Sequence, residues 1–253
     1  LKQVPTCEYF PYEAVLTNIT GPENIVRAIR DLQLPVEVVV GISTDKAVKP
    51  VNVMGMTKSI QERIFARANL ELPHTRIVIV RYGNVLASRG SVIPLFHEQI
   101  RTGGPVTITH PDMTRFLLSL DDAVDLIFAA VRGARRGETY IPRVPGARMV
   151  DVAAALVGDR PIKTTVTGIR PGEKLHEILI SEEEAHRTVQ RGQHYVIGPI
   201  LPELQADSPA QSALDREYSS ADDLLSLDGV IDLMRRRRLM VDDSLEFEGE
   251  FLR

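Results

Sequence analysis

Residues 1–90 alternate between helical patterns and short runs of β-branched side chains. Residues 21–32 and 54–70 carry apolar residues at the spacing of an amphipathic helix, whereas residues 36–43 and 76–85 are continuous runs rich in Val and Ile. Such a run is typical of a strand that is buried on both faces of a parallel sheet. Strand, helix and strand in this order form a βαβ unit, so we predict an α/β fold with a Rossmann-type, doubly wound parallel sheet.

Beyond residue 90 the predicted elements are shorter. The pattern predicts helices at 91–102, 121–134, 148–157 and 173–180, and strands at 105–109, 137–142 and 162–168. We assign residues 1–90 to a Rossmann-type domain, residues 91–200 to a smaller α/β substrate domain that caps the sheet, and residues 201–253 to an extended segment, a helix and a frayed tail. Residues 121–142 are expected to return to the first domain.

A polar cluster follows the first predicted strand. Thr44, Asp45 and Lys46 bring a hydroxyl, a carboxylate and an ammonium together at the end of the sheet where parallel α/β folds bind ligands. Met54 and Lys58 are four residues apart on the next predicted helix, so they share one of its faces. The core-facing stripe of that helix is predicted to be Met56, Ile60 and Ile64.

The composition argues against several kinds of partner. The net charge is −4 and the pI about 5.9, and the basic run at residues 235–238 ends a predicted helix, so we expect no nucleic-acid partner. No apolar run reaches the length of a membrane span, and no signal-peptide pattern occurs. A single cysteine, Cys7, allows no disulfide framework, which is typical of a cytoplasmic protein. The six histidines lack metal-ligand spacing, so we predict no metal.

The spacing of Thr44, Met54 and Lys58 resembles the active site of the short-chain dehydrogenase/reductase superfamily, which has Ser or Thr followed by Tyr-x-x-x-Lys. Met54 stands at the tyrosine position, as in one group of related dehydratases. Methionine cannot transfer protons, so another group must accept the proton of the substrate hydroxyl that is oxidised. The sequence Thr-Asp-Lys at residues 44–46 resembles the motif that the nucleotide-sugar 4,6-dehydratases have at the Ser/Thr position. Four segments resemble the polysaccharide-biosynthesis branch that acts on UDP-N-acetylglucosamine: STDKAVKPVNVMG (43–55), RYGNVLASRGSVIPLF (81–96), ITHPDMTRF (108–116) and GIRPGEKLHE (168–177).

This resemblance implies an internal redox reaction that converts UDP-N-acetylglucosamine to a UDP-4-keto-6-deoxy-N-acetylhexosamine for surface polysaccharide or capsule. In such enzymes a hydride leaves sugar carbon 4, water is eliminated across carbons 5 and 6, and the hydride returns to carbon 6. The implied catalytic residues are Asp45 as the acid for the 6-hydroxyl, Lys46 as the base at carbon 5, and Thr44 as a relay. The base role requires surroundings that lower the pKa of Lys46 toward neutrality. If Lys46 also serves when carbon 5 is reprotonated, the resemblance implies inversion at that carbon, and retention is the alternative.

The resemblance also carries over residues that bind the two ligands. On the side of the cofactor, NADP with NAD as the alternative, they are Asn18, Ser43, Lys58, Tyr82 and Val85. On the side of UDP-N-acetylglucosamine they are Lys2, Asn84, Arg89, Thr109, Arg170 and Glu173. An arginine suits a diphosphate because its planar group donates two parallel hydrogen bonds. Relatives commonly assemble as dimers or hexamers, so we expect a homo-oligomer for the full-length protein.

One part of the dinucleotide-binding pattern is missing. Such a fold needs a Gly-rich turn between its first strand and helix, and neither G-x-G-x-x-G nor G-x-x-G-x-x-G occurs in the chain. We therefore expect an incomplete Rossmann domain, with roughly 80–90 residues preceding Leu1 in the whole protein, and no activity from this piece alone. The alternatives are a nucleotide-sugar 4-epimerase of the same superfamily, which the Asp45–Lys46 pair and the missing tyrosine disfavour, and a non-catalytic fragment.

Overall fold

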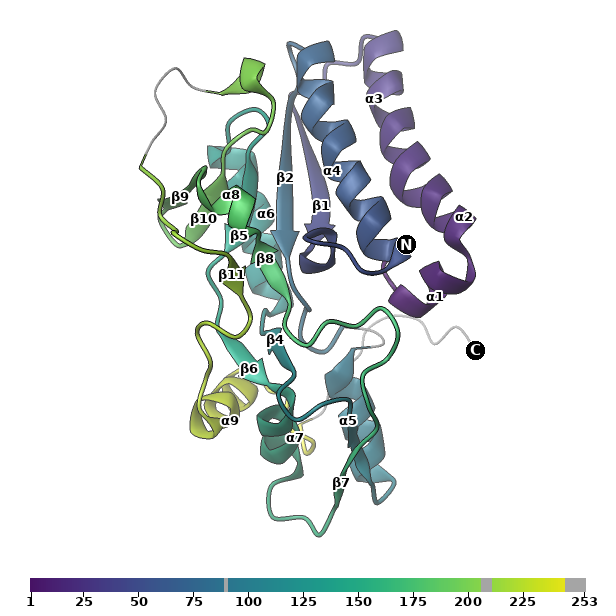
Figure 1. Ribbon diagram of the computed structural model, residues 1–253, viewed down its shortest axis with the longest axis vertical. Helices are drawn as coiled ribbons and strands as arrows, with labels where there is room; N and C mark the ends of the chain where they lie inside the picture. Colours follow the sequence, from purple (N-terminus) through teal and green to yellow (C-terminus); the bar gives the residue numbers. More distant parts are fainter. Residues whose placement is uncertain (89–90, 206–210, 244–253) are drawn as a thin grey trace.

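A five-stranded sheet forms the upper part of the molecule in Figure 1, in the order β1-β2-β5-β10-β9. The computed structural model describes residues 1–88, 91–205 and 211–243. The strands are β1 (Val38–Thr44), β2 (Arg76–Tyr82), β5 (Thr139–Pro142), β9 (Thr188–Arg191) and β10 (His194–Ile197). The first three are parallel, and β10 and β9 add an antiparallel edge. The predicted α/β class with an incomplete Rossmann-type sheet is confirmed.

Helices cover both faces of this sheet. On one face lie α3 (Gly21–Asp31) and α4 (Val53–Glu71), and on the other lies α6 (Leu120–Gly133). Strand β2 sends Ile77 and Ile79 into the core under α3 and α4, and sends Val78 and Val80 into the core under α6. Because successive side chains point to opposite faces, β2 is buried on both sides, which explains its continuous apolar run.

The face of α4 that meets the sheet differs from the predicted stripe. Met56 and Ile60 are about half exposed, whereas Gln61 and Glu62 are buried. Gln61 donates a hydrogen bond to the backbone of β1, and Glu62 forms an ion pair with Arg81. The predicted stripe is therefore wrong at Met56 and Ile60, whereas Ile64 packs against the core next to the sheet. A count of apolar residues does not register polar side chains that are buried with partners.

A second layer of short elements forms the lower part of Figure 1. Its elements are α5 (Val92–Arg101), β3 (Val106–Ile108), β4 (Thr114–Phe116), β6 (Gly146–Arg148), α7 (Met149–Val157), β7 (Thr164–Val166) and α9 (Leu227–Arg236). Phe96 from α5, Leu156 from α7 and Met234 from α9 are buried in one apolar cluster. Helix α9 therefore packs into the same core as α5 and α7, although it lies far from them in the sequence.

The helix predicted at residues 173–180 is wrong. Gly172 has a φ of +79°, and the chain continues as an irregular segment into strand β8 (Ile178–Ile180). Strand β8 pairs with β11 (Tyr218–Ser219), and the backbone of Leu175 accepts a hydrogen bond from Thr114 N. Partners from distant segments thus satisfy the backbone groups that a helix would pair within itself. The remaining α-helices are α1 (Val4–Tyr9), α2 (Pro11–Val15) and α8 (Glu182–Ala185), and a π-helical segment (Leu16–Thr20) joins α2 to α3.

A buried ion network ties β2 to α4 and α8. The Arg81 guanidinium donates to both carboxylate oxygens of Glu62, at 3.0 and 2.6 Å, and to both of Glu184, at 2.8 and 3.0 Å. Ser43 also donates to Glu62. Burial alone raises the pKa of Glu184, but the charge and hydrogen bonds of Arg81 outweigh it and lower that pKa to about 2.

We expect Glu184 to make the folded protein sensitive to acid. Its pKa falls from 4.5 to about 2 on folding, so its contribution to stability is complete above pH 4.5 and is lost as the pH falls toward 2. The loss should be on the order of 3 kcal/mol, which urea unfolding across this range would measure. Glu184→Gln should be less stable at neutral pH and lose less on acidification. Exposed Glu182→Gln is the control, and an unchanged acid dependence in Glu184→Gln would contradict the assignment.

Candidate active site

The three candidate catalytic residues lie together at the carboxyl end of β1. Thr44 ends the strand, and Asp45 and Lys46 begin a 3-10 turn. The Thr44 hydroxyl accepts a hydrogen bond from the Lys46 backbone N–H at 3.4 Å and donates one to Asp45 Oδ1 at 2.8 Å. Helix α4 approaches so closely that a Cβ on Gly55 would lie 2.1 Å from the Lys46 carbonyl oxygen. Local hydrogen bonds and close packing therefore hold the turn in place.

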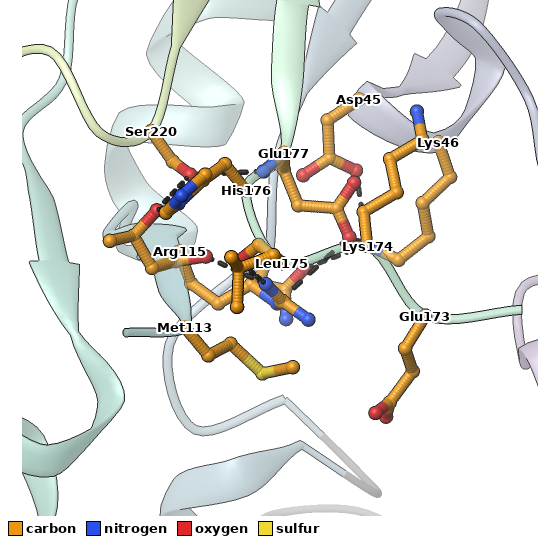
Figure 2. Close-up of polar contacts among 12 residues, drawn as sticks. Asp45, Lys46, Met113, Arg115, Glu173, Lys174, Leu175, His176, Glu177 and Ser220 are labelled. Atoms are coloured by element: carbon orange, nitrogen blue, oxygen red, sulfur yellow. Dashed lines mark hydrogen bonds and ion pairs between the residues drawn. The ribbon is translucent and has the colours of Figure 1, made fainter. Parts of the chain in front are cut away.

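The Lys46 ammonium lies among oxygen atoms of three side chains, and Figure 2 shows two of these, Asp45 and Glu177, beside Lys46. Its Nζ lies 3.1 Å from Asp45 Oδ1, 3.0 Å from Asn84 Oδ1 and 3.3 Å from Glu177 Oε1. The Lys46 side chain is 19% exposed, whereas those of Asp45 and Glu177 are 0% and 2% exposed. Lys46 is therefore the charged group of this cluster that a ligand can reach, and the two carboxylates lie behind it.

The charge state of Lys46 differs from the one that its predicted base role requires. Burial on its own lowers the pKa of Lys46, but the carboxylates of Asp45 and Glu177 outweigh burial, so the pKa is raised above its ordinary value. The expected lowering toward neutrality is wrong for this arrangement. Lys46 is an ammonium at neutral pH and must first lose a proton before it can act as a base.

Two buried carboxylate oxygens of the cluster have no hydrogen-bond partner in the described part of the chain: Asp45 Oδ2 and Glu177 Oε2. Asp45 Oδ2 faces Gly83, on which a Cβ would lie only 3.0 Å away. Burial, and next to it the charge of Asp45, raise the pKa of Glu177. An unpartnered buried carboxylate is unfavourable in a folded protein, so these two oxygens mark a site for proton transfer or for a ligand.

Glu177 reaches the cluster through contacts between distant segments. Its backbone N–H donates to Ser220 Oγ at 3.0 Å, and that hydroxyl lies 2.6 Å from Thr114 Oγ1. The Thr114 hydroxyl also lies 2.9 Å from His176 Nδ1, and Arg115 Nε lies 3.9 Å from Glu177 Oε1. Figure 2 shows the Glu177 side chain next to Asp45, with Ser220 and His176 farther from Lys46. Segments around residues 45, 115, 177 and 220 thus build one site.

Sequence reasoning missed Glu177, Arg115 and Ser220 as site residues. The motif that contains Glu177 is visible in the sequence, but the predicted helix obscured the orientation of its side chains. The sequence did contain a signal for a strand. Leu175, Glu177 and Leu179 are two residues apart, before and within β8, so on a strand they lie on the same face. A buried glutamate in such an alternation is unusual enough to indicate a polar site.

A shallow cleft opens beside the cluster. Asn84 and Arg115 line the cleft at the end that the cluster occupies, and both contact cluster residues. The remaining wall is largely apolar and includes Val85, Leu117 and Met149. A mostly apolar cleft with a few converging polar groups is typical of a small-molecule site.

The residues predicted to bind the nicotinamide side lie near β1 and β2. Lys58 Nζ donates to the Ile42 carbonyl at 3.1 Å and to Gln61 Oε1 at 3.0 Å. Tyr82 pairs in register with Thr44, and burial raises its pKa. Val85 forms an isolated bridge with the backbone of Leu118. Lys58 and Tyr82 are thus placed at the same end of the sheet as Thr44.

Three other predicted positions face away from the cluster. The Ser43 hydroxyl is buried and donates to Glu62, so it belongs to the ion network. Asn18 is buried and donates to Thr57 Oγ1 and to the Leu1 carbonyl. Met54, at the position of the family tyrosine, packs in a small core with Cys7 and Ala14.

The remaining predicted substrate residues form no hydrogen bond or ion pair with the cluster, within the described ranges. Lys2 and Arg170 are exposed, Thr109 donates to Met113 Sδ at 2.9 Å, and the Glu173 carboxylate accepts the Arg170 backbone N–H at 3.3 Å. Arg89 lies outside the described residues. Among the residues that the structure describes, no group of three His, Cys, Asp or Glu side chains is placed to hold a metal ion.

Known proteins are similar to this chain over most of its length. The family model described as "Polysaccharide biosynthesis protein" matches residues 1–199. An uncharacterized membrane protein of Methanocaldococcus jannaschii is 46% identical over 210 residues, 79% of this chain and 62% of that protein. A UDP-glucose 4-epimerase of Rickettsia canadensis is 44% identical over 201 residues, 78% of this chain and 58% of that protein. The chain therefore spans about three fifths of the length of these relatives.

Solved structures share the fold. Pen from Bacillus thuringiensis matches with a TM-score of 0.86 and 32% identity, over 95% of this chain and 74% of that chain. DesIV, a dTDP-glucose 4,6-dehydratase from Streptomyces venezuelae solved with NAD bound, matches with a TM-score of 0.58 and 18% identity, over 69% of this chain and 60% of that chain. The second likeness concerns the fold alone. Among the described residues, no helix has the length and apolar character of a membrane span.

Proposed function

This chain belongs to the polysaccharide biosynthesis protein family, and we propose that the complete protein is a nucleotide-sugar 4,6-dehydratase. The proposed substrate is UDP-N-acetylglucosamine, and the product is a UDP-4-keto-6-deoxy-N-acetylhexosamine. The observation that supports this best is a reachable Lys46 ammonium backed by Asp45 and Glu177 beside a cleft. Elimination of water next to a ketone needs one group that takes the carbon-5 proton and another that protonates the 6-hydroxyl, and this cluster contains both.

A nicotinamide cofactor fits the described residues at one end of the sheet. Lys58 donates two hydrogen bonds and has a third N–H for a ribose hydroxyl, so we assign Lys58 and the neighbouring Tyr82 to the nicotinamide ribose. When bound, NADP or NAD would accept the carbon-4 hydride and return it to carbon 6. A Gly-rich turn for the diphosphate does not occur in this sequence, so the proposal applies to a protein in which another segment supplies it.

Thr44 and Asp45 form the proposed route for the proton of the 4-hydroxyl. As carbon 4 is oxidised, the sugar O–H bond breaks and its proton passes to Thr44 Oγ1. The Thr44 proton moves at the same time to Asp45 Oδ1, along the existing 2.8 Å hydrogen bond. Asp45 later returns this proton through Thr44 to the departing 6-hydroxyl, which leaves as water. Since Asp45 is fully buried, the hydroxyl of Thr44 takes the part that a tyrosine has in other relatives.

Lys46 is the proposed acid and base at carbon 5. As a free amine it takes the carbon-5 proton during the elimination, and as an ammonium it returns a proton when carbon 6 is reduced. No proton is consumed overall, because the 4-hydroxyl proton leaves in the water molecule. We propose inversion at carbon 5, which requires the sugar ring to change its conformation after the elimination so that Lys46 meets the opposite face of carbon 5.

A 4-epimerase is the second candidate, because relatives that are 44% identical carry the name UDP-glucose 4-epimerase. Epimerisation needs only oxidation and reduction at carbon 4. It leaves the carbon-5 hydrogen and the 6-hydroxyl in place, so it gives no role to a proton-transfer group beyond the one that serves the 4-hydroxyl. The cluster of Lys46, Asp45 and Glu177 favours the dehydratase for this reason.

An incubation in deuterated water tests the proposal. The full-length protein, purified with its nicotinamide cofactor, is given UDP-N-acetylglucosamine, and the products are followed by NMR. We expect a 4-keto-6-deoxy sugar with one deuterium at carbon 5, and the stereochemistry at that carbon reports inversion or retention. A UDP-N-acetylgalactosamine product without deuterium at carbon 5 would establish the epimerase instead. Formation of neither sugar would rule out both functions.

A further inference from the structure

Glu177 contacts the proposed base but has no part in the steps above. We propose that Glu177 accepts a proton from the Lys46 ammonium and so produces the free amine that the elimination needs. Glu177 is in this sense a positioning residue, because it acts on the sugar only through Lys46. The inference rests on the proposed dehydratase function and explains how a lysine that is charged at rest becomes a base.

The contacts of Glu177 favour this role. Its Oε1 lies 3.3 Å from Lys46 Nζ, close enough for a direct N–H to O transfer after a small movement, while its Oε2 has no hydrogen-bond partner among the described residues. The backbone around Glu177 is held by Ser220, through hydrogen bonds of 3.0 and 2.8 Å. Because no hydrogen bond among the described residues holds Oε2, the carboxyl group can turn and take the Lys46 proton on Oε1 without breaking a hydrogen bond.

The proton transfer is balanced within the pair. One N–H bond of Lys46 breaks, one O–H bond of Glu177 forms, and a positive and a negative charge become two neutral groups. The amine retains two N–H groups, enough for the hydrogen bonds to Asp45 Oδ1 and Asn84 Oδ1. Rotation about the Cε–Nζ bond then turns the nitrogen lone pair toward the cleft.

Substrate binding supplies the driving force. The Lys46 side chain retains 19% exposure, and a sugar in the cleft would remove this remaining contact with water. Loss of water disfavours both charges, so it favours the neutral pair. The raised pKa of Glu177 acts in the same direction, and the charge of Asp45 contributes to it, whereas Arg115 and Lys174 oppose it. The raised pKa of Lys46 also opposes the transfer, which keeps the lysine charged until a substrate arrives.

Two substitutions separate this role from a purely structural one. Glu177→Gln keeps the size and hydrogen-bonding capacity of the side chain but removes its ability to accept a proton. Glu177→Asp keeps the carboxyl group but shortens its reach. If Glu177 only held the loop in place, the glutamine variant would be the more active of the two. If it accepts a proton, the aspartate variant is the more active.

The rate at which deuterium enters carbon 5 of the sugar, measured with the full-length, cofactor-containing protein, shows which of the two variants is more active. We expect Glu177→Gln to lower kcat for dehydration by about 100-fold or more with a nearly unchanged KM, and Glu177→Asp to retain more activity. Glu182→Gln, an exposed change on α8, is the control and should match the wild type. A Glu177→Gln variant as active as the wild type would overturn the proposal, as would an aspartate variant less active than the glutamine variant.

A titration without turnover keeps this test separate from that of the dehydratase function. The side-chain resonances of 13C-labelled glutamate and lysine are followed by NMR against pH, with Glu177 assigned from the Glu177→Gln spectrum. We expect the Glu177 titration to move to higher pH in Lys46→Met, because an ammonium that favours the carboxylate is removed. An identical Glu177 titration in both proteins would refute the pair. A wild-type protein that forms no dehydrated sugar would refute the dehydratase function instead.

Discussion

Replacement of Lys46 by methionine should lower kcat for dehydration by about 10²–10⁴-fold in the full-length, cofactor-containing protein, because general acid–base catalysis at carbon 5 is lost. Oxidation at carbon 4 should persist, since Thr44 and Asp45 carry the proton of the 4-hydroxyl. Reduced nicotinamide should then accumulate, and its absorbance together with NMR of the sugar would measure both steps. Methionine retains most of the length and apolar stem of the lysine, so the change isolates the loss of the amine.

Lys49→Met is the matched control. Lys49 lies on the same loop, is exposed, and pairs with Glu217 at 2.7 Å on the surface. Exposed ion pairs contribute little to stability, so this variant should be as stable and as active as the wild type. Equal activity of Lys46→Met and Lys49→Met would refute the role of Lys46 in catalysis.

Replacement of Arg81 by methionine should lower the free energy of unfolding by about 3–5 kcal/mol, as expected when one partner of a buried ion pair is removed. Glu62 and Glu184 would then be two buried carboxylates without the guanidinium that donates to all four of their oxygens. Urea unfolding at neutral pH measures the loss. Acidification should relieve part of it, because protonation removes the uncompensated charges.

Arg148→Met provides the comparison on the surface. Arg148 is exposed and forms two hydrogen bonds with Asp151, at 2.9 and 3.2 Å. Its removal should change the free energy of unfolding by about 1 kcal/mol or less. Similar losses for Arg81→Met and Arg148→Met would show that the buried network contributes no more than a surface pair.

The sequence was informative about the site where the relevant residues are neighbours in the chain. Thr44, Asp45 and Lys46 directly follow a run whose apolar character predicts a parallel strand, so their placement at its carboxyl end followed from periodicity. The roles of Met54 and Ser43 were harder to predict, because each depends on which side chains lie opposite. Met54 meets Cys7 and Ala14, and Ser43 meets Glu62. Such contacts depend on how α1, α2 and α4 pack, and this packing cannot be predicted from a local sequence pattern.

Local patterns were sufficient for the α/β class, for the central strands and for the position of the Asp45–Lys46 pair, because periodicity and strand-end chemistry are properties of adjacent residues. The tertiary structure alone brought Glu177, Arg115 and Ser220 to that pair, since their distant segments meet through the pairing of β8 with β11 and the contacts of Thr114. It also reversed the expected direction of the Lys46 pKa. That direction depends on the balance between burial and two nearby carboxylates, and the distances that set this balance exist only in the folded chain.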